Sequence, residues 1–191
     1  MGAEKKAAAV FIVHETGPAA YPFSVVQSKV TEQFDLVTAD QNRSRAAIEG
    51  APGASGLAKG LTSYGDTGFS LFLRKAFIKG AGYTDDALDR RIVGIVDTGS
   101  AFNPCHGNSA QLVEAVKRGV MLAGGLPMEF PVISIHESFA SPTSMFLRNL
   151  MSIDTEEMIR AQPMDAVVLI GGCDKTVPAQ LMGAASANIP A

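Results

Sequence analysis

Several residue types are scarce in this sequence, and each scarcity excludes a class of protein. The 191 residues contain no tryptophan, two cysteines and three histidines. Two cysteines are too few to cross-link a disulfide-rich secreted scaffold. The 16 basic and 19 acidic residues give a formal net charge of -3 without any long block of one sign, so nucleic acid is not expected as a partner. A hydrophobic content of 47% at this low charge excludes intrinsic disorder.

Long apolar runs are also missing. None approaches the roughly 20 apolar residues that a membrane-spanning helix needs. The N-terminal run, residues 7–13, follows two lysines but stops at His14 and Glu15, too early for the apolar region of a signal peptide. We therefore expect no contact with a membrane, and a cytoplasmic location.

Residues 91–191 alternate between strand-like and helix-like patterns. Short runs rich in β-branched residues predict buried strands, and apolar residues at helical spacing predict the helices between them. This β-α-β-α-β-α order with short connections predicts an α/β fold with a parallel sheet and right-handed crossovers. The predicted strands are 92–96, 130–135 and 165–170, and the predicted helices are 109–123, about 141–162 and about 178–187.

Residues 1–60 form a leader of uncertain origin. Two strand-like runs, 10–13 and 36–38, flank a helical pattern at about 24–34, which gives a small β-α-β-like unit. The glycine-rich stretch 50–56 is typical of a boundary, so we divide the chain into 1–60 and 61–191. The leader weakly resembles the start of the D-2-hydroxyacid dehydrogenase family, but it carries no nucleotide-binding fingerprint.

Polar loops follow each of the three predicted strands. Because the carboxyl ends of parallel strands meet at one edge of the sheet, where open α/β folds bind ligands, these loops are expected to converge. The chain separation between the two cysteines, 173 − 105 = 68 residues, is therefore no obstacle to a shared site. The candidate site residues are Cys105, His136, Glu137, Cys173, Asp174 and Lys175.

The loop residues fit metal chemistry, although each also has a structural interpretation. Cys105 and Cys173 are too few for a four-thiolate zinc site but could supply part of the ligands of an iron–sulfur cluster; otherwise they are inert buried thiols. Glu137, Asp174 and Lys175 could form a hard-cation site, or Asp174 and Lys175 could be an ordinary charged pair at a helix start. The nearby histidines are acid–base candidates or simply polar loop residues.

Five separate motifs, in order and at matching spacing, closely resemble the dihydroxy-acid and sugar-acid dehydratase family. The resemblance covers about residues 68–191, and Arg148-Asn149-Leu150-Met151 leans toward the sugar-acid (aldonate) branch. It identifies 61–191 as part of the family's N-terminal, cluster-binding domain. The motifs are Asn103-Pro104-Cys105-His106, residues 116–120 (VKRGV), residues 123–131 (AGGLPMEFP), Gly172-Cys173-Asp174-Lys175-Thr176 and residues 181–185 (LMGAA).

The resemblance implies a role for each matching residue. Cys105 and Cys173 match two of the family's three iron–sulfur ligands, with a 2Fe–2S cluster favoured over 4Fe–4S. Asp174 matches a Mg²⁺ ligand, and Lys175 matches the lysine that is carbamylated to become another and acts in catalysis. Glu137 stands in the loop where the family places a metal-binding acid, often aspartate. A basic residue, Arg74 or Lys75, would lie near the substrate carboxylate.

The implied activity is that of a hydro-lyase, converting a 2,3-dihydroxy (sugar) acid into a 2-keto-3-deoxy acid with an iron–sulfur cluster and Mg²⁺. The family's third cysteine lies beyond the position of Ala191, so we expect an incomplete N-terminal domain and little or no activity of this chain alone. The expected partner is a small polyhydroxy acid, and the full-length family is expected to form homo-oligomers. The alternative is a non-catalytic α/β binding or assembly module derived from such an enzyme.

Overall fold

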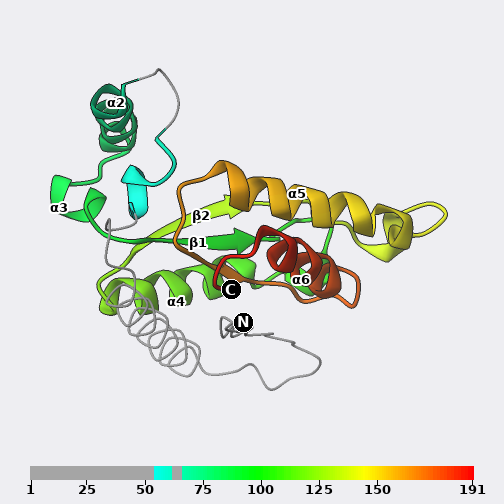
Figure 1. Ribbon diagram of the computed structural model, residues 1–191. Helices are drawn as coiled ribbons and strands as arrows, with labels where there is room; N and C mark the ends of the chain where they lie inside the picture. Colours follow the sequence, from blue (N-terminus) through cyan, green and yellow to red (C-terminus); the bar gives the residue numbers. More distant parts are fainter. Residues whose placement is uncertain (1–53, 62–65) are drawn as a thin grey trace, which may run out of the picture.

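Two runs rich in β-branched residues, together with the proline-containing residues 126–131, form a three-stranded parallel sheet at the centre of the protein (Figure 1). The structure is a computed structural model, and it describes residues 54–61 and 66–191. Strand β1 (Ile92–Asp97) pairs with β2 (Leu126–Pro131) on one side and with β3 (Ala166–Leu169) on the other. The predicted parallel α/β fold is confirmed, whereas the strands and helices predicted within residues 1–53 lie outside the described part.

Helices connect the strands in the predicted order. Helix α4 (Ser109–Leu122) joins β1 to β2, helix α5 (Arg148–Ala161) joins β2 to β3, and α6 (Thr176–Ala187) follows β3. Two further helices, α2 (Thr67–Gly80) and α3 (Asp85–Leu88), precede β1. Four short 3₁₀ turns complete the described elements: η1 (Gly56–Ala58), η2 (Pro104–His106), η3 (Glu137–Phe139) and η4 (Ser144–Leu147).

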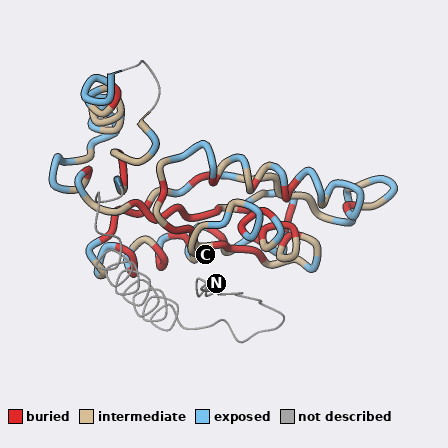
Figure 2. The backbone as a smooth tube through the Cα atoms, viewed as in Figure 1, coloured by how far each residue is buried: buried red, intermediate tan, exposed pale blue. Residues whose placement is uncertain are grey.

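The two faces of β1 are buried against different helices. Val93 and Ile95 pack with apolar residues of α4, and Ile92 and Val96 pack on the opposite face with residues from α5 and α6. Successive side chains of a strand point to opposite faces, so a continuous apolar run is what a strand covered on both sides requires. Figure 2 shows the burial concentrated along the strands and on the inner sides of these helices.

The second strand was predicted four residues too late. It spans Leu126–Pro131 rather than 130–135, and it pairs with the whole of β1. Pro127 and Pro131 lie in it, which is tolerated because β2 is at the edge of the described sheet and a proline on such a strand need not donate to a ladder. The two prolines made residues 126–131 a poor match to a strand pattern, so the apolar residues of 130–135 were predicted as the strand instead.

The helix predicted from about residue 141 begins later. Residues 140–143 are loop, the 3₁₀ turn η4 follows, and α5 starts at Arg148. Thr143 explains the start of η4, because its extended backbone and its side-chain oxygen, which accepts from Met145 N–H, cap the turn. The α5 end at Ala161, just before Pro163, agrees with the prediction.

Residues 56–59 of the predicted leader pack against the sheet domain. Leu57 is buried in the cluster on the α5 and α6 face. Asp165 accepts hydrogen bonds at 2.9 Å from the backbone N–H groups of both Gly56 and Ile92, which ties η1 to the start of β1. Arg74 of α2 donates to the backbone carbonyls of Leu57, Lys59 and Gly60.

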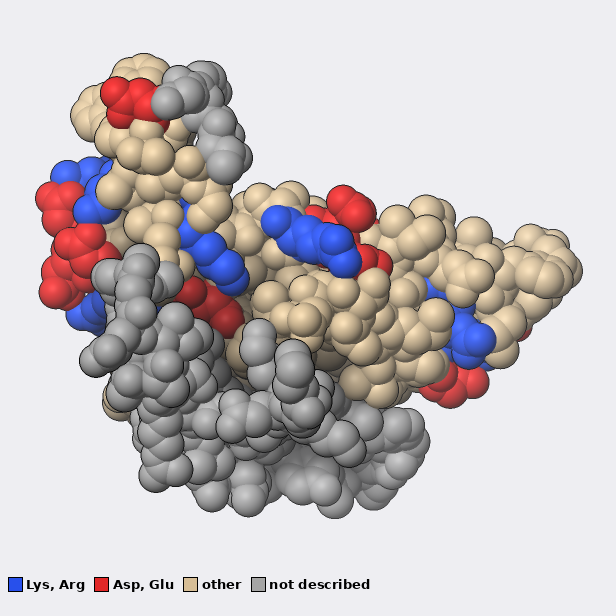
Figure 3. All heavy atoms as spheres, viewed as in Figure 1, with Lys and Arg blue, Asp and Glu red and all other residues tan. Residues whose placement is uncertain are grey.

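Charged and apolar side chains are unevenly distributed over the surface (Figure 3). Ion pairs such as Lys79–Asp85 and Arg90–Asp86 gather over α2 and α3. At the opposite end, exposed apolar side chains include Phe139 and Phe146. In the part of the chain that the structure describes, no helix combines the length and the apolar character needed to cross a membrane.

The two hydrogen bonds accepted by Asp165 predict that its loss lowers the free energy of unfolding more than the loss of Asp89 does. Asp165→Ala leaves two backbone N–H groups without their acceptor and is expected to lower the free energy of unfolding by about 1–3 kcal/mol. Asp89→Ala removes only an exposed pair with Lys75 and is expected to cost at most about 1 kcal/mol. Urea denaturation of the two variants measures the difference, and equal losses would contradict it.

Candidate metal and cofactor site

The three polar loops do converge at the carboxyl edge of the sheet. Cys105 lies in η2, which follows β1, and Cys173 lies in the loop between β3 and α6. The structure places the two cysteines close enough for Cys105 to contribute to the raised pKa of the Cys173 thiol, although 68 residues separate them in the chain. The parallel register brings them together, because β1 and β3 are direct neighbours and their ends coincide, Val96 opposite Leu169.

A glycine makes this approach possible. A Cβ atom on Gly172 would lie 2.4 Å from the Cys105 carbonyl oxygen and 3.0 Å from His106 Cδ2. Both distances are too short for a side chain, and the carbonyl belongs to a backbone that cannot simply swing aside. The Gly172-Cys173 loop therefore rests directly on the η2 backbone, which places Cys173 beside Cys105.

The two thiols have different surroundings. Cys105 is exposed, whereas Cys173 is partly buried. Burial, followed by the contact with Cys105, raises the pKa of the Cys173 thiol to about 11. Cys173 is therefore a protonated thiol at neutral pH, and a metal that binds it must displace the proton.

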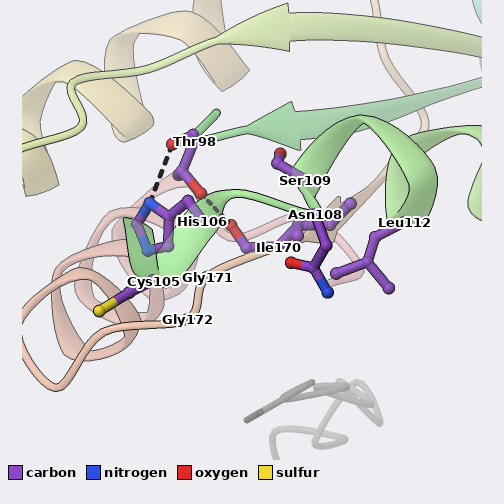
Figure 4. Close-up of a pocket in the computed structure, with 9 residues that line it drawn as sticks. All are labelled: Thr98, Cys105, His106, Asn108, Ser109, Leu112, Ile170, Gly171 and Gly172. Carbon is purple, nitrogen blue, oxygen red and sulfur yellow. Dashed lines mark hydrogen bonds between the residues drawn. The ribbon is translucent and has the colours of Figure 1, made fainter. Parts of the chain in front are cut away.

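Behind the cysteines lies a buried polar network. His106 is 4% exposed, and its Nδ1 lies 2.9 Å from the Thr98 carbonyl and 3.1 Å from Ser134 Oγ (Figure 4). Burial is the main cause that lowers the His106 pKa, so the ring is neutral at pH 7. Asn103 is fully buried and contacts His106, Ser134 and, through its Oδ1 at 3.5 Å, the Cys173 thiol.

The acidic residues meet around Lys175. Its Nζ lies 3.5 Å from Glu137 Oε2 and 3.2 Å from Asp174 Oδ2, so the residues after β2 and after β3 share one cation. Glu137 also accepts hydrogen bonds from the backbone N–H and the hydroxyl of Ser144. The bonds from Ser144 and Thr143, with a smaller contribution from Lys175, lower the pKa of Glu137 to about 2.

The donor types suit the groups that the family resemblance implies. Thiols are soft donors of the kind that an iron–sulfur cluster takes. The two carboxylates that pair with Lys175 are hard donors of the kind that Mg²⁺ prefers. Two of the three buried polar atoms without a partner among residues 54–61 and 66–191, His106 Nε2 and Thr176 Oγ1, lie beside these loops. Within the same residues, no three His, Cys, Asp or Glu side chains are arranged to hold a metal by themselves.

Other candidate residues lie elsewhere or have other roles. Arg74 lies near Ile92, at the opposite end of β1, and its guanidinium is bound to backbone carbonyls. Lys75 pairs with Asp89. Neither is brought to the loop cluster. His136 Nδ1 accepts from Ser138 N–H, and its ring lies against Phe139.

Sequence reasoning did not single out Asn103, Ser134 or Ser144 as parts of the site. Asn103 belongs to the Asn-Pro-Cys-His motif, and its place two residues before a candidate ligand was a usable signal. Ser134 and Ser144 carry no such signal, because only the folded loop after β2 brings them to His106 and Glu137.

Helices on both faces of a parallel sheet, with thiols and carboxylates gathered at its carboxyl edge, define an α/β domain of the kind found in many enzymes. The profile of the dihydroxy-acid/6-phosphogluconate dehydratase N-terminal family matches residues 90–191. This match spans more than half of the chain, and the chain belongs to that family.

Curated relatives agree with the family. The chain is 51% identical over 121 residues to an L-arabonate dehydratase of Azospirillum brasilense, which is 63% of this chain and 21% of the relative. It is 48% identical over 100 residues to a D-xylonate dehydratase of Caulobacter vibrioides, 52% of this chain and 17% of the relative. It is 40% identical over 130 residues to a dihydroxy-acid dehydratase of Moorella thermoacetica, 65% of this chain and 24% of the relative. The chain thus spans about a fifth of the length of these relatives.

The contact at Gly172 predicts that a single methyl group disturbs the site. Gly172→Ala forces the loop away from the Cys105 carbonyl and is expected to lower the free energy of unfolding by about 1–3 kcal/mol. Gly80→Ala, at the end of α2, meets no atom within 4 Å and is the matched control. Urea denaturation measures both, and an unchanged stability of Gly172→Ala would refute the role given to this contact.

The hydrogen bonds at Glu137 predict a shift in its titration. Ser144→Ala removes the hydroxyl donor, so the Glu137 pKa is expected to rise from about 2 toward its ordinary value of 4.5. Because the folded-state pKa is depressed, the stabilisation by ionised Glu137 is present above pH 4.5 and is lost as the pH falls toward 2. Carbon-13 NMR of the metal-free protein follows this carboxyl group. Ser138→Ala, which removes a hydroxyl from the neighbouring η3, serves as the control.

Proposed function

We propose that this chain is the cluster-binding portion of a hydro-lyase that dehydrates a polyhydroxy acid, an aldonate by preference, to a 2-keto-3-deoxy acid. Cys105 and Cys173 would be thiolate ligands of an iron–sulfur cluster, and Glu137, Asp174 and carbamylated Lys175 would hold Mg²⁺. The observation that carries this proposal is the convergence of the thiol pair and the Lys175-centred carboxylates at one edge of the sheet.

The thiol pair supports the cluster assignment. Because Cys105 and Cys173 follow the ends of neighbouring parallel strands and Cys105 affects the Cys173 pKa, both could be ligands of one cluster without a rearrangement of the strands. The absence of a side chain on Gly172 lets the loop backbone lie close to such a group. Cys105 and Cys173 would be two of the ligands of such a cluster.

Lys175 supports the magnesium assignment in an indirect way. Its ammonium group stands between the two carboxylates, where a bound cation would compete with it. Asp174, and then Glu137, raise the Lys175 pKa and hold the amine protonated. The ammonium group would first lose a proton, and the free amine would then add CO₂ and release a second proton to form a carbamate, so that an anion replaces a cation. That exchange would turn the three side chains into an anionic ligand set.

The chain's own residues would then orient the site. When bound, the iron and Mg²⁺ would supply Lewis acidity for the loss of the C3 hydroxyl and of the C2 proton. Ser144 holds Glu137 ionised, and the amino terminus of α6, which begins directly after Lys175, favours negative charge at this position. Asp97, at the end of β1, accepts from the Ser109 hydroxyl and from Gly99 N–H, which fixes the start of the loop that carries Cys105.

The names of the relatives favour the aldonate branch. An L-arabonate dehydratase and a D-xylonate dehydratase match at 51% and 48% identity, and a dihydroxy-acid dehydratase matches at 40%. We therefore propose a small sugar acid as the substrate. A cytoplasmic location and assembly into homo-oligomers stay predictions from the family resemblance.

Iron and sulfide analysis tests the cluster ligands. The purified chain, incubated with ferrous iron, sulfide and excess glutathione as an external thiolate, is expected to bind a cluster that either Cys105→Ser or Cys173→Ser abolishes. Ala110→Ser adds a serine at an exposed position of α4 and should retain the cluster. If all these proteins fold and none binds iron, the chain is a non-catalytic module.

Activity measurements test the completeness of the site. The reconstituted chain, assayed with L-arabonate and D-xylonate, is expected to form little or no 2-keto acid, because its described residues supply two thiols and no complete metal-binding group. Robust product formation that Lys175→Ala abolishes would show that the chain carries a whole active site and would refute the incomplete ligand set.

A further inference from the structure

The side-chain amide of Asn103 lies at the junction of three loops. Asn103 is fully buried in the segment after β1, and its Nδ2 lies 3.2 Å from Ser134 Oγ in the segment after β2. Its Oδ1 lies 3.5 Å from the Sγ of Cys173, in the loop after β3. In a buried amide both the NH₂ donor and the oxygen acceptor need hydrogen-bond partners. The orientation of the amide therefore depends on which neighbouring atoms carry protons.

His106 constrains that orientation. The Thr98 carbonyl, 2.9 Å from His106 Nδ1, can only accept, so Nδ1 carries the ring proton. Nε2, buried without a partner among the described residues, is then a bare acceptor rather than an unsatisfied N–H donor. The 3.1 Å contact between Asn103 Nδ2 and this protonated Nδ1 therefore brings two donors together.

The thiol form of Cys173 offsets this unfavourable contact, because its S–H donates to Asn103 Oδ1. A metal that binds Cys173 removes that proton and leaves a negatively charged sulfur, which an amide oxygen would repel. Rotation of the amide by half a turn about its Cβ–Cγ bond exchanges its two ends without moving any neighbour. Nδ2 then donates to the sulfur, and Oδ1 accepts from the Ser134 hydroxyl and faces His106 Nδ1–H.

We propose that Asn103 is a positioning residue whose side-chain N–H donates a hydrogen bond to the Cys173 sulfur when that cysteine holds a metal. The inference rests on the proposed function, which makes Cys173 a ligand. Hydrogen bonds of this kind hold a metal ligand in place and withdraw negative charge from it. The buried Ser134–Asn103–Cys173 chain would thereby fix the position of the sulfur.

Cadmium-113 NMR of the wild-type chain tests the hydrogen bond directly. Cd²⁺ binds thiolates, and a hydrogen bond to a ligand sulfur transmits scalar coupling from the metal to the donated proton. With nitrogen-15-labelled chain we expect couplings from cadmium to the β-protons of both cysteines and to one side-chain amide proton of Asn103. Couplings to the β-protons without the amide coupling would overturn this inference alone. The absence of any cysteine coupling would overturn the ligand assignment and the inference with it.

Cobalt binding to two variants separates this role from a merely structural one. Asn103→Leu keeps a similar volume but loses the N–H, so it is expected to weaken Co²⁺ binding about 10–100-fold. The thiolate-to-cobalt charge-transfer band should move to lower energy, because the sulfur is no longer stabilised. Ser134→Ala perturbs the other end of the amide and should leave the band in place. An unshifted band in folded Asn103→Leu would refute the inference; if that variant does not fold, the cadmium experiment on the wild type decides.

Discussion

The contact between the loop after β3 and the backbone of η2 is the constraint on which the rest of the site depends. Gly172 lies so close to the Cys105 carbonyl that a single added carbon would stand 2.4 Å from it. This closeness places the two cysteines beside each other and positions the loop that carries Asp174 and Lys175, directly before α6. It is possible only because β1 and β3 are adjacent and parallel, so that both loops leave the sheet at the same edge.

The site has two parts with opposite electrostatic character. Around the thiols, burial and a neutral histidine keep charge out, and Cys173 retains its proton. Around Lys175, two carboxylates gather on one ammonium and Glu137 stays ionised even in acid. Soft thiols and hard carboxylates thus lie within a few residues of each other, which is the arrangement that the proposed reaction, with both kinds of metal, would use. The buried amide of Asn103 belongs to the first part and links it to the segment after β2.

Sequence patterns predicted the central features of the fold for clear physical reasons. Ile92–Val96 and Asp165–Ile170 are apolar and β-branched because both faces of these strands are covered, and Gly124-Gly125 ends a helix as expected. The errors have physical causes as well. Pro127 and Pro131 are poor strand residues anywhere except at a sheet edge, and edge position is a property of the assembled sheet. The start of α5 was misplaced because Thr143 caps a 3₁₀ turn first.

The sequence by itself determined the alternation of strands and helices, the edge at which the polar loops meet, and the family to which the chain belongs, because these follow from local periodicity and from motifs in a fixed order. Only the tertiary structure decided which atoms touch. The proximity of the two cysteines, the sharing of Lys175 by Glu137 and Asp174, and the burial of Asn103 between three loops join residues up to 70 positions apart. Such contacts depend on register, loop path and side-chain packing, and no local pattern encodes them.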